Sequence, residues 1–332
     1  MTTKNKPLAS LSLDLDNLWS YMKTHGDRGW ESFPSYLDLV VPRVLEFLEK
    51  RGLKITFFVV GQDAALEVNQ AAIRSLADAG HEIGNHSFNH EPWLHLYSEQ
   101  QIESELSRTE EQLERVTGQK TIGFRGPGYS LSLSVLRVLT RRGYQYDAST
   151  LPTFLGPLAR AYYFMTTKLS PEEKANRKLL FGQLRDGLRP LRPYRWSIDG
   201  VNDGLIEIPV TTMPIFRIPF HVSYILYLYR FSPVVAHIYF RLAMILCRLT
   251  RTHPSLLLHP LDFLGGDDVK ELSFFPAMNL RGEEKVKLVS DILGIYSDYF
   301  TVVPMGEHAR AISRQKEIAA IEPQFRSIPM RS

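Results

Sequence analysis

Hydrophobic and polar positions follow two alternating patterns along the first half of the chain. Short apolar runs typical of strands occur at residues 9–15 and 53–61, and again near 81–87, 121–127 and 144–150. Between them lie stretches whose apolar residues are three or four positions apart, and several of these stretches end at a glycine. Strands that alternate with helices predict repeated βα units around a parallel sheet, so the expected fold class is α/β.

The second half of the chain interrupts this pattern before returning to it. Residues 151–195 carry nine Lys or Arg against three acidic residues, and we interpret them as an insertion. Strands are expected again at 206–210 and 254–260, followed by a helix over 283–298. We therefore expect a single domain over residues 1–310, followed by a polar, basic and poorly packed tail over 311–332.

Residues 213–249 have an unusual composition. They contain eight aromatic residues between Phe216 and Phe240, four arginines and no Asp or Glu. The arginines and three prolines exclude a single membrane-spanning helix. Two interpretations remain open: the apolar residues belong to the core and the arginines to a solvated face, or the segment contacts an anionic membrane surface.

Composition narrows the functional classes. The chain has 332 residues, 44% of them hydrophobic and 23% charged, which excludes disordered and fibrous proteins. A net charge of +3 is too small to indicate a nucleic-acid partner. Cys247 is the single cysteine, so an internal disulfide and a cysteine metal site are excluded. The first residues lack the apolar run of a secretory signal, so we expect a cytoplasmic protein, peripheral at the inner face of the membrane if residues 213–249 bind lipid.

Two aspartates and two histidines have the spacing of a metal site. Asp14 and Asp16 lie two apart in the apolar strand LSLDLD, so both carboxylates point to one face, where their repulsion favours a bound cation. His86 and His90 have the i, i+4 spacing of two imidazoles on one helical turn. Each pair alone is equally well explained by exposed or structural side chains. Together they predict a two-histidine, one-carboxylate site with open coordination positions, which is typical of catalysis.

Two further motifs place functional groups at strand ends. Arg125 begins the sequence RGPGY directly after a strand, where it can pair with an aspartate of the first motif. The glycines and proline of this loop are expected to expose backbone N–H groups to an oxyanion. His259 follows the apolar run SLLL, a position suited to a general acid at the carboxyl end of a barrel strand. The remaining histidines, His221 among them, have no comparable partner, and we interpret them as structural or surface residues.

The segments SLDLD, TFFVVG, HEIGNHSFNH, FRGPGYS and LLLHP, in this order, resemble the polysaccharide deacetylase family, which shares the NodB homology domain and corresponds to carbohydrate esterase family 4. The similar branch has an Asp-x-Asp first motif. The resemblance covers about residues 8–150 well and 200–305 loosely. It implies a distorted, incomplete (β/α) barrel with one divalent metal ion, commonly Zn2+, with Co2+, Ni2+, Mn2+ or Fe2+ as alternatives.

The resemblance also implies roles for individual residues. It makes Asp14 the general base, Arg125 the residue that orients this base, and His259 the general acid. The metal ligands that it implies are Asp16, His86 and His90. Because Leu15 separates the two aspartates, where the family more commonly has adjacent ones, the choice between base and ligand stays open. Further out, Pro127 and Tyr129 would contact the substrate or its oxyanion, and Asp147 is a candidate for the acid that supports His259.

The implied reaction is removal of an N-acyl group, acetyl or formyl, from an amino sugar. Since a cytoplasmic enzyme cannot reach an extracellular polymer, we expect an intracellular glycan precursor, and residues 213–249 favour one linked to polyprenyl phosphate. Two alternatives remain: an amidohydrolase acting on small amides or imides, and a non-catalytic module that binds glycan or lipid. An iron oxygenase would also use two histidines and one carboxylate, but the arginine loop favours hydrolysis.

Overall fold

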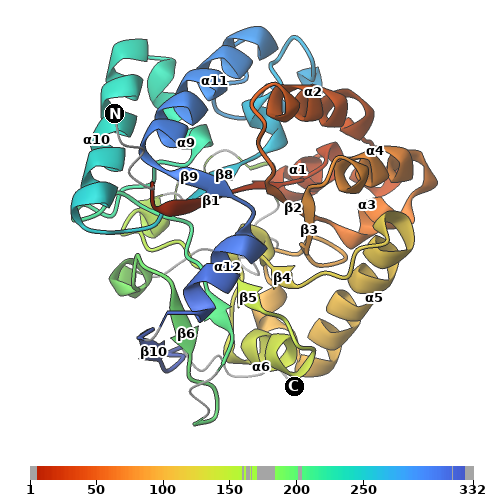
Figure 1. Ribbon diagram of the computed structural model, residues 1–332. Helices are drawn as coiled ribbons and strands as arrows, with labels where there is room; N and C mark the ends of the chain where they lie inside the picture. The colour runs from red at the N-terminus through yellow and green to blue at the C-terminus, as the bar shows by residue number, and fades with distance from the viewer. Residues whose placement is uncertain are drawn as a thin grey trace.

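The computed structural model describes residues 6–158, 161, 165, 167–169, 184–200, 204–315 and 317–325 (Figure 1). Within these residues ten strands form one sheet in the order β10-β6-β7-β5-β4-β3-β2-β1-β8, with β9 paired to β1. The strands are β1 (Leu8–Asp14), β2 (Thr56–Val59), β3 (Glu82–Asn85), β4 (Gly123–Phe124), β5 (Tyr146–Asp147), β6 (Tyr194–Trp196), β7 (Ile206–Glu207), β8 (Ser255–Leu258), β9 (Thr301–Val303) and β10 (Ala320–Ile321). Apart from the antiparallel pair β6 and β7, all paired strands are parallel.

The sheet curls until its two sides nearly meet. The Thr211 N–H, beyond β7, donates to the Ser255 carbonyl at the start of β8 over 3.1 Å. In return the Ser255 N–H donates to Thr211 Oγ1 over 2.8 Å. No continuous strand ladder joins these sides in the described residues, so the barrel is incomplete. The fold class predicted from the sequence is therefore confirmed.

Helices surround the strands in Figure 1. They are α1 (Leu18–His25), α2 (Leu37–Glu49), α3 (Gly61–Ala65), α4 (Glu67–Asp78), α5 (Glu99–Thr117), α6 (Leu133–Arg141), α9 (Val222–Tyr229), α10 (Pro233–Leu249), α11 (Gly282–Tyr299) and α12 (Met305–Ser313). Helix α5 shows why the sequence forms them: Ser98 and Gln101 make a capping box, and Gly118 ends the helix in a left-handed conformation. Short 3-10 turns are η1 (Trp30–Ser32), η2 (Leu94–Leu96), η3 (Pro127–Tyr129), η4 (Leu184–Leu188), η5 (Pro260–Asp262) and η6 (Lys270–Leu272).

Side chains of strand β1 point alternately to the hydrophobic core and to a polar region inside the barrel. Leu11, Leu13 and Leu15 are buried in the main hydrophobic core together with apolar residues of the surrounding helices. Ser12 and Asp14 are also buried, but they point to the other face, where they meet polar groups. The period of two thus places every functional group of this segment inside the barrel.

Helix α12 covers one end of the barrel. The Met305 N–H donates to Thr56 Oγ1 over 2.8 Å, and the Gly306 N–H donates to the Glu82 carboxylate over 2.8 Å. Thr56 and Glu82 begin β2 and β3, so α12 lies at the amino ends of the strands. The metal-site residues follow the carboxyl ends, which leaves that mouth of the barrel to the site.

Two expectations about the chain's organisation need comment. Much of the predicted insertion, including residues 170–183, lies outside the described residues. The tail predicted over 311–332 is wrong in part, because α12 continues to Ser313 and Ile321 of β10 pairs with Trp196 of β6. This part of the chain is packed because Ile321 and Phe325 contact a small hydrophobic core that contains Trp196.

Residues 213–249 form the two helices α9 and α10 with an irregular segment before them. Phe220, Ile225 and Phe240 are fully buried, as expected for core residues. Other apolar residues, such as Ile238 at 60% exposure, lie on the surface. The core interpretation is thus confirmed for the buried residues, whereas contact with a membrane surface stays a prediction. None of the helices in the described residues is long and apolar enough to cross a membrane.

Candidate active site

Three side chains converge where β1 and β3 end. Asp16 Oδ1 lies 2.9 Å from His90 Nε2 and 3.3 Å from His86 Nε2. The ligand atoms of all three residues lie within 4.8 Å of one another, and the side chains are nearly buried. Both imidazoles thus face the same carboxylate oxygen, so the three groups meet at a common point. This is the arrangement that the sequence predicted for a metal site.

The histidines reach this point from a loop, so the expected helical turn is wrong. After β3, Ser87 and His90 have positive φ values of 60° and 51°. The loop is held from outside: the backbone N–H groups of Phe88 and Asn89 both donate to the Glu105 carboxylate over 2.9 Å. Because Glu105 satisfies these donors, the backbone does not need helical hydrogen bonds, although the i, i+4 spacing is the same.

The tautomer of His86 suits metal binding. Its Nδ1 lies 2.6 Å from the backbone carbonyl of Arg125, which can only accept, so Nδ1 carries the proton and the Nε2 lone pair points at Asp16. Burial opposes ionisation of Asp16, but the charge of His90 and hydrogen bonds from both histidines in their protonated forms outweigh it and hold the pKa of Asp16 well below the usual value. The donor set, two imidazole nitrogens and one carboxylate oxygen, therefore fits a divalent cation such as zinc.

Asp14 is bound by the arginine predicted to orient it. Arg125 is fully buried, and its Nη1 donates to Asp14 Oδ1 over 2.6 Å and to Ser12 Oγ over 2.8 Å. Its Nε donates to the Ala148 carbonyl over 3.0 Å, and its guanidinium lies 4.3 Å from the Phe58 ring centre. These contacts fix Asp14 beside the metal cluster, while Asp16 has no contact with the arginine.

The loop after Arg125 is tightly folded on itself. The Gly126 N–H donates to Ser149 Oγ over 2.8 Å, and the Tyr129 and Ser130 N–H groups donate to carbonyls of the same loop. The expectation of several free N–H groups is therefore wrong, because the turn satisfies them internally. Pro127 is buried and holds the turn, and Tyr129 is half-buried. Burial and the Asp14 charge raise the pKa of the Tyr129 hydroxyl, which stays protonated as a donor.

His259 follows β8, as predicted, and is supported by a residue that the sequence did not indicate. Ser223 Oγ lies 3.2 Å from His259 Nδ1 and donates to Asp262 over 2.9 Å. The other oxygen of Asp262 accepts the His259 backbone N–H over 2.8 Å. His221 was interpreted as structural or surface, yet its ring centre lies 6.1 Å from that of His259. Burial, with His259 and Arg125, lowers the pKa of His221 to about 3, so it is neutral.

Asp147 does not support His259. It accepts a hydrogen bond from Ser149 Oγ over 2.5 Å, and Ser149 in turn holds the Gly126 N–H. In the described residues no contact joins Asp147 to His259. The role predicted for Asp147 is therefore wrong: its position on β5, next to β4, directs it to the arginine loop.

Residues 27–146 match the sequence profile of the family described as Polysaccharide deacetylase. The fold is also that of a crystal structure from Mycobacterium smegmatis described as a polysaccharide deacetylase, with a TM-score of 0.64 and 22% identity over 98% of this chain and 97% of that chain. The resemblance to the polysaccharide deacetylase family that the sequence motifs indicated is therefore confirmed over residues 27–146. His86, His90 and Arg125 lie within the matched residues, whereas Asp14, Asp16 and His259 lie outside them.

Two curated relatives are peptidoglycan deacetylases by name. The Helicobacter pylori peptidoglycan deacetylase is 26% identical over 209 residues, which is 61% of this chain and 64% of that protein. The peptidoglycan-N-acetylmuramic acid deacetylase PdaA of Bacillus subtilis is 38% identical over 105 residues, 31% of this chain and 39% of that protein. The alignments thus span less than two thirds of the length of either relative.

The buried Asp63, close to the cluster, was not indicated by the sequence pattern. Asp63 accepts hydrogen bonds from Asn17 Nδ2 over 2.7 Å and from Trp19 Nε1 over 2.9 Å. The Trp19 ring stands edge-on to His90, with the ring centres 6.5 Å apart. Burial raises the pKa of Asp63 to about 7, although these two donors oppose the shift. The sequence around Asp63 contains no signal for this role, because Asn17 and Trp19 lie more than 40 residues away.

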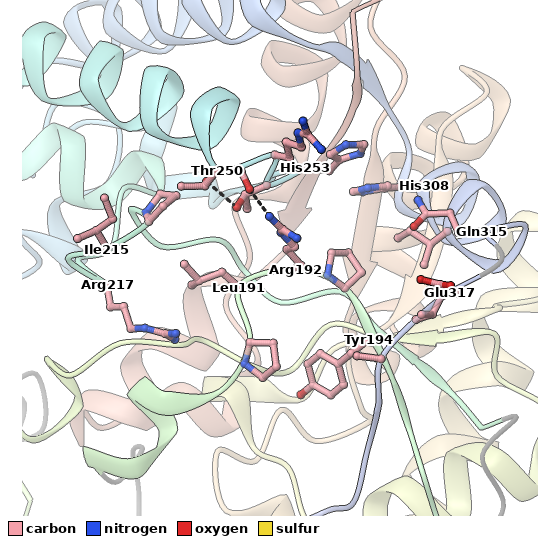
Figure 2. A pocket seen from close by; sticks show the side chains of 18 residues that line it. Leu191, Arg192, Tyr194, Ile215, Arg217, Thr250, His253, His308, Gln315 and Glu317 are labelled. Atoms are coloured by element: carbon pink, nitrogen blue, oxygen red, sulfur yellow. Dashed lines mark hydrogen bonds between the residues drawn. The ribbon is translucent and has the colours of Figure 1, made fainter.

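A cavity of about 570 Å3 lies apart from the metal cluster (Figure 2). His253, which precedes β8, lines it, whereas His259 of the active site follows β8. Arg192, Arg217 and Arg251 also line it, together with Glu317. None of the candidate metal ligands contributes to its wall, so the cavity and the candidate metal site are separate places in the fold.

Proposed function

We propose that the protein is a metal-dependent hydrolase that removes an N-acyl group, acetyl or formyl, from an amino sugar. The observation that carries this proposal is the convergence of Asp16, His86 and His90 beside an aspartate held by a buried arginine. The names of the curated relatives, which are peptidoglycan deacetylases, support the same reaction class.

The cation that we propose is zinc, held by Asp16, His86 and His90. Three protein ligands leave positions free for water and the substrate's carbonyl oxygen. When bound, such a cation supplies an acidified water and polarises the amide carbonyl. Co2+, Ni2+, Mn2+ and Fe2+ suit the same donors and are tested alongside zinc.

The protein's own groups divide the proton transfers between them. Asp14 accepts the proton of the attacking water as general base. Arg125 orients the Asp14 carboxylate through the hydrogen bond from Nη1 to Oδ1, which is 2.6 Å long. His259 donates a proton to the leaving amine nitrogen, which would otherwise depart as a strongly basic anion. Ser223 and Asp262 set the orientation of the His259 ring. The protonated Tyr129 hydroxyl near Asp14 is a donor for the developing oxyanion.

For the substrate, we propose an amino sugar on a lipid-linked precursor, processed at the cytoplasmic face of a membrane. The support comes from α9: Ser223 in its first turn contacts His259, and the helix leads into α10, whose outer side is apolar and exposed. A sugar bound at His259 would therefore lie beside α9, the helix that leads into the one carrying this apolar surface.

The test is mass spectrometry of products after incubation of the metal-loaded protein with three substrate classes. These are lipid-linked N-acyl amino sugars, soluble chito-oligosaccharides and small cyclic amides. We expect loss of the acyl group from the lipid-linked sugar, no activity in Asp14→Asn, and unchanged activity in His81→Asn, which alters a buried histidine outside the site. Turnover of chito-oligosaccharides alone would disprove the lipid linkage, and turnover of cyclic amides alone would disprove the sugar substrate.

A further inference from the structure

Helix α10 has two apolar sides, and only one of them is buried. Its inner side packs into the main core through Ala236, Phe240, Ala243, Met244 and Cys247, all fully buried. Seven large apolar residues of α10 and the preceding loop are 42% to 74% exposed: Phe231, Val234, Val235, Ile238, Leu242, Ile245 and Leu249. We call these seven residues the outer stripe.

The outer stripe is continuous along the helix. Its members are spaced three or four residues apart, apart from the adjacent pair Val234 and Val235. At 100° per residue they fall within a sector of about 100°, opposite the buried residues. A solvent-facing helix side normally carries polar residues, and soluble monomers seldom expose apolar patches of more than a few hundred Å2. The outer stripe therefore has the character of a docking surface.

The charges next to the outer stripe are positive. Arg241 and Arg248 border it on one side and Arg230 lies at its amino end, all three exposed. Among the described residues none of them forms an ion pair, whereas His237 on the same side lies 3.3 Å from Asp291 of α11. Residues 213–249 contain no Asp or Glu. The surface is thus apolar along its middle and cationic at its border.

The cavity of Figure 2 extends this charge beyond the helix. Leu249 ends α10, and Thr250 and Arg251 then line the cavity. Arg192, which donates to the Thr250 carbonyl, and Arg217 line it as well. The cavity wall contains three arginines and one glutamate, so its net charge is positive. This cationic site lies at the carboxyl end of the outer stripe.

We propose that the outer stripe docks the protein on an anionic lipid surface. Its apolar side chains would enter the boundary between headgroups and acyl chains, while the bordering arginines contact lipid phosphates. A second copy of this chain is a poorer partner, because a symmetric dimer would bring the same arginines together, and the neighbouring acid Asp291 already faces His237. The proposal does not depend on the hydrolytic reaction, since it rests on residues away from the metal cluster.

The test is sedimentation of the full chain with vesicles of phosphatidylcholine alone and with one third phosphatidylglycerol. We expect binding to the anionic vesicles only, weakening as salt rises. Ile238→Ser with Leu242→Ser should weaken binding about tenfold or more, whereas Val68→Ser, at 75% exposure on α4, should not change it. Arg241→Glu should weaken it about tenfold, and Lys120→Glu, an equal charge change on another surface, should have little effect.

Three outcomes would overturn the proposal. One is absence of binding to anionic vesicles by the wild type, and another is equal binding by the Ile238→Ser, Leu242→Ser variant. The third is a dimer in analytical ultracentrifugation without lipid that this variant converts to monomer, which would make a second copy the partner. Because none of these measurements uses turnover, failure here is distinguishable from failure of the proposed deacylase activity.

Discussion

Replacing Asp14 by Asn is expected to affect stability as well as turnover. The substitution keeps the shape of the side chain but removes the negative charge beside Arg125. The guanidinium is fully buried, so it cannot turn to solvent, and its other partners, Ser12 Oγ and the Ala148 carbonyl, are uncharged. A buried cation would then lack a counter-charge.

The size of the effect follows from this burial. Removing one partner of a buried ion pair costs about 3–5 kcal/mol, whereas removing both can be nearly neutral. The asparagine oxygen still accepts from Arg125 Nη1, at about half the strength of a charged acceptor, so we expect a loss of about 3 kcal/mol in unfolding free energy. Adding Arg125→Met should restore at least half of that loss. Turnover should fall about 100-fold or more in both variants, because the base is gone.

Urea unfolding at pH 7 in a fixed zinc concentration measures four stabilities, those of the wild type, Asp14→Asn, Arg125→Met and the double variant. Metal analysis and product assays accompany it. A loss of less than 1 kcal/mol in Asp14→Asn would refute the argument, as would a double variant whose loss equals the sum of the single losses. Asp16→Asn is the matched control, since Asp16 does not touch Arg125. If Asp14→Asn releases the metal and Asp16→Asn retains it, the two aspartates exchange roles.

Three further predictions concern single sites. The purified protein should hold about one divalent ion per chain by mass spectrometry of the elements, and His86→Ala should lose it; full occupancy in that variant would exclude His86 as a ligand. Gly126→Ala should lower the unfolding free energy by about 2 kcal/mol or more, because the added Cβ would lie 2.2 Å from the Ser130 carbonyl oxygen. An unchanged midpoint of urea unfolding would contradict this geometry. Burial lowers the pKa of His308 to about 3, so below pH 6.5 the unfolded chain binds a proton that the folded chain does not, and stability falls with pH. Between pH 6.5 and 4 the unfolding free energy of the wild type should fall by about 3 kcal/mol more than that of His308→Asn. Parallel pH profiles of the two proteins would disprove this prediction.

Local sequence pattern predicted the strands and the residues at their ends well. The alternation in LSLDLD places Asp14 and Asp16 inside the barrel because a strand's side chains alternate whatever its neighbours are. Likewise, the apolar run before His259 predicts a strand end directly. These features depend on residues close together in the chain, which is why the sequence alone indicates them.

Features that depend on distant partners were missed or misassigned. The i, i+4 spacing of His86 and His90 fits both a helix and a loop, and the choice is made by Glu105, which binds the loop backbone. The support of His259 comes from Ser223, which lies 36 residues earlier. The sequence left open whether the outer stripe is exposed, because a helix that is apolar on two sides is also compatible with burial of both.

The position of α12 has a consequence for how the active site matures during synthesis. Met305 Sδ lies 3.5 Å from Arg125 Nη2, and the same helix binds the first residues of β2 and β3. A ribosome-bound chain therefore presents Asp14, His86 and Arg125 long before the helix that closes the barrel beneath them exists. Until α12 docks, water can reach the guanidinium from below and compete for Asp14. Catalytic competence should thus appear late, when residues near 305 have left the ribosome, even though most of the site's residues were made first.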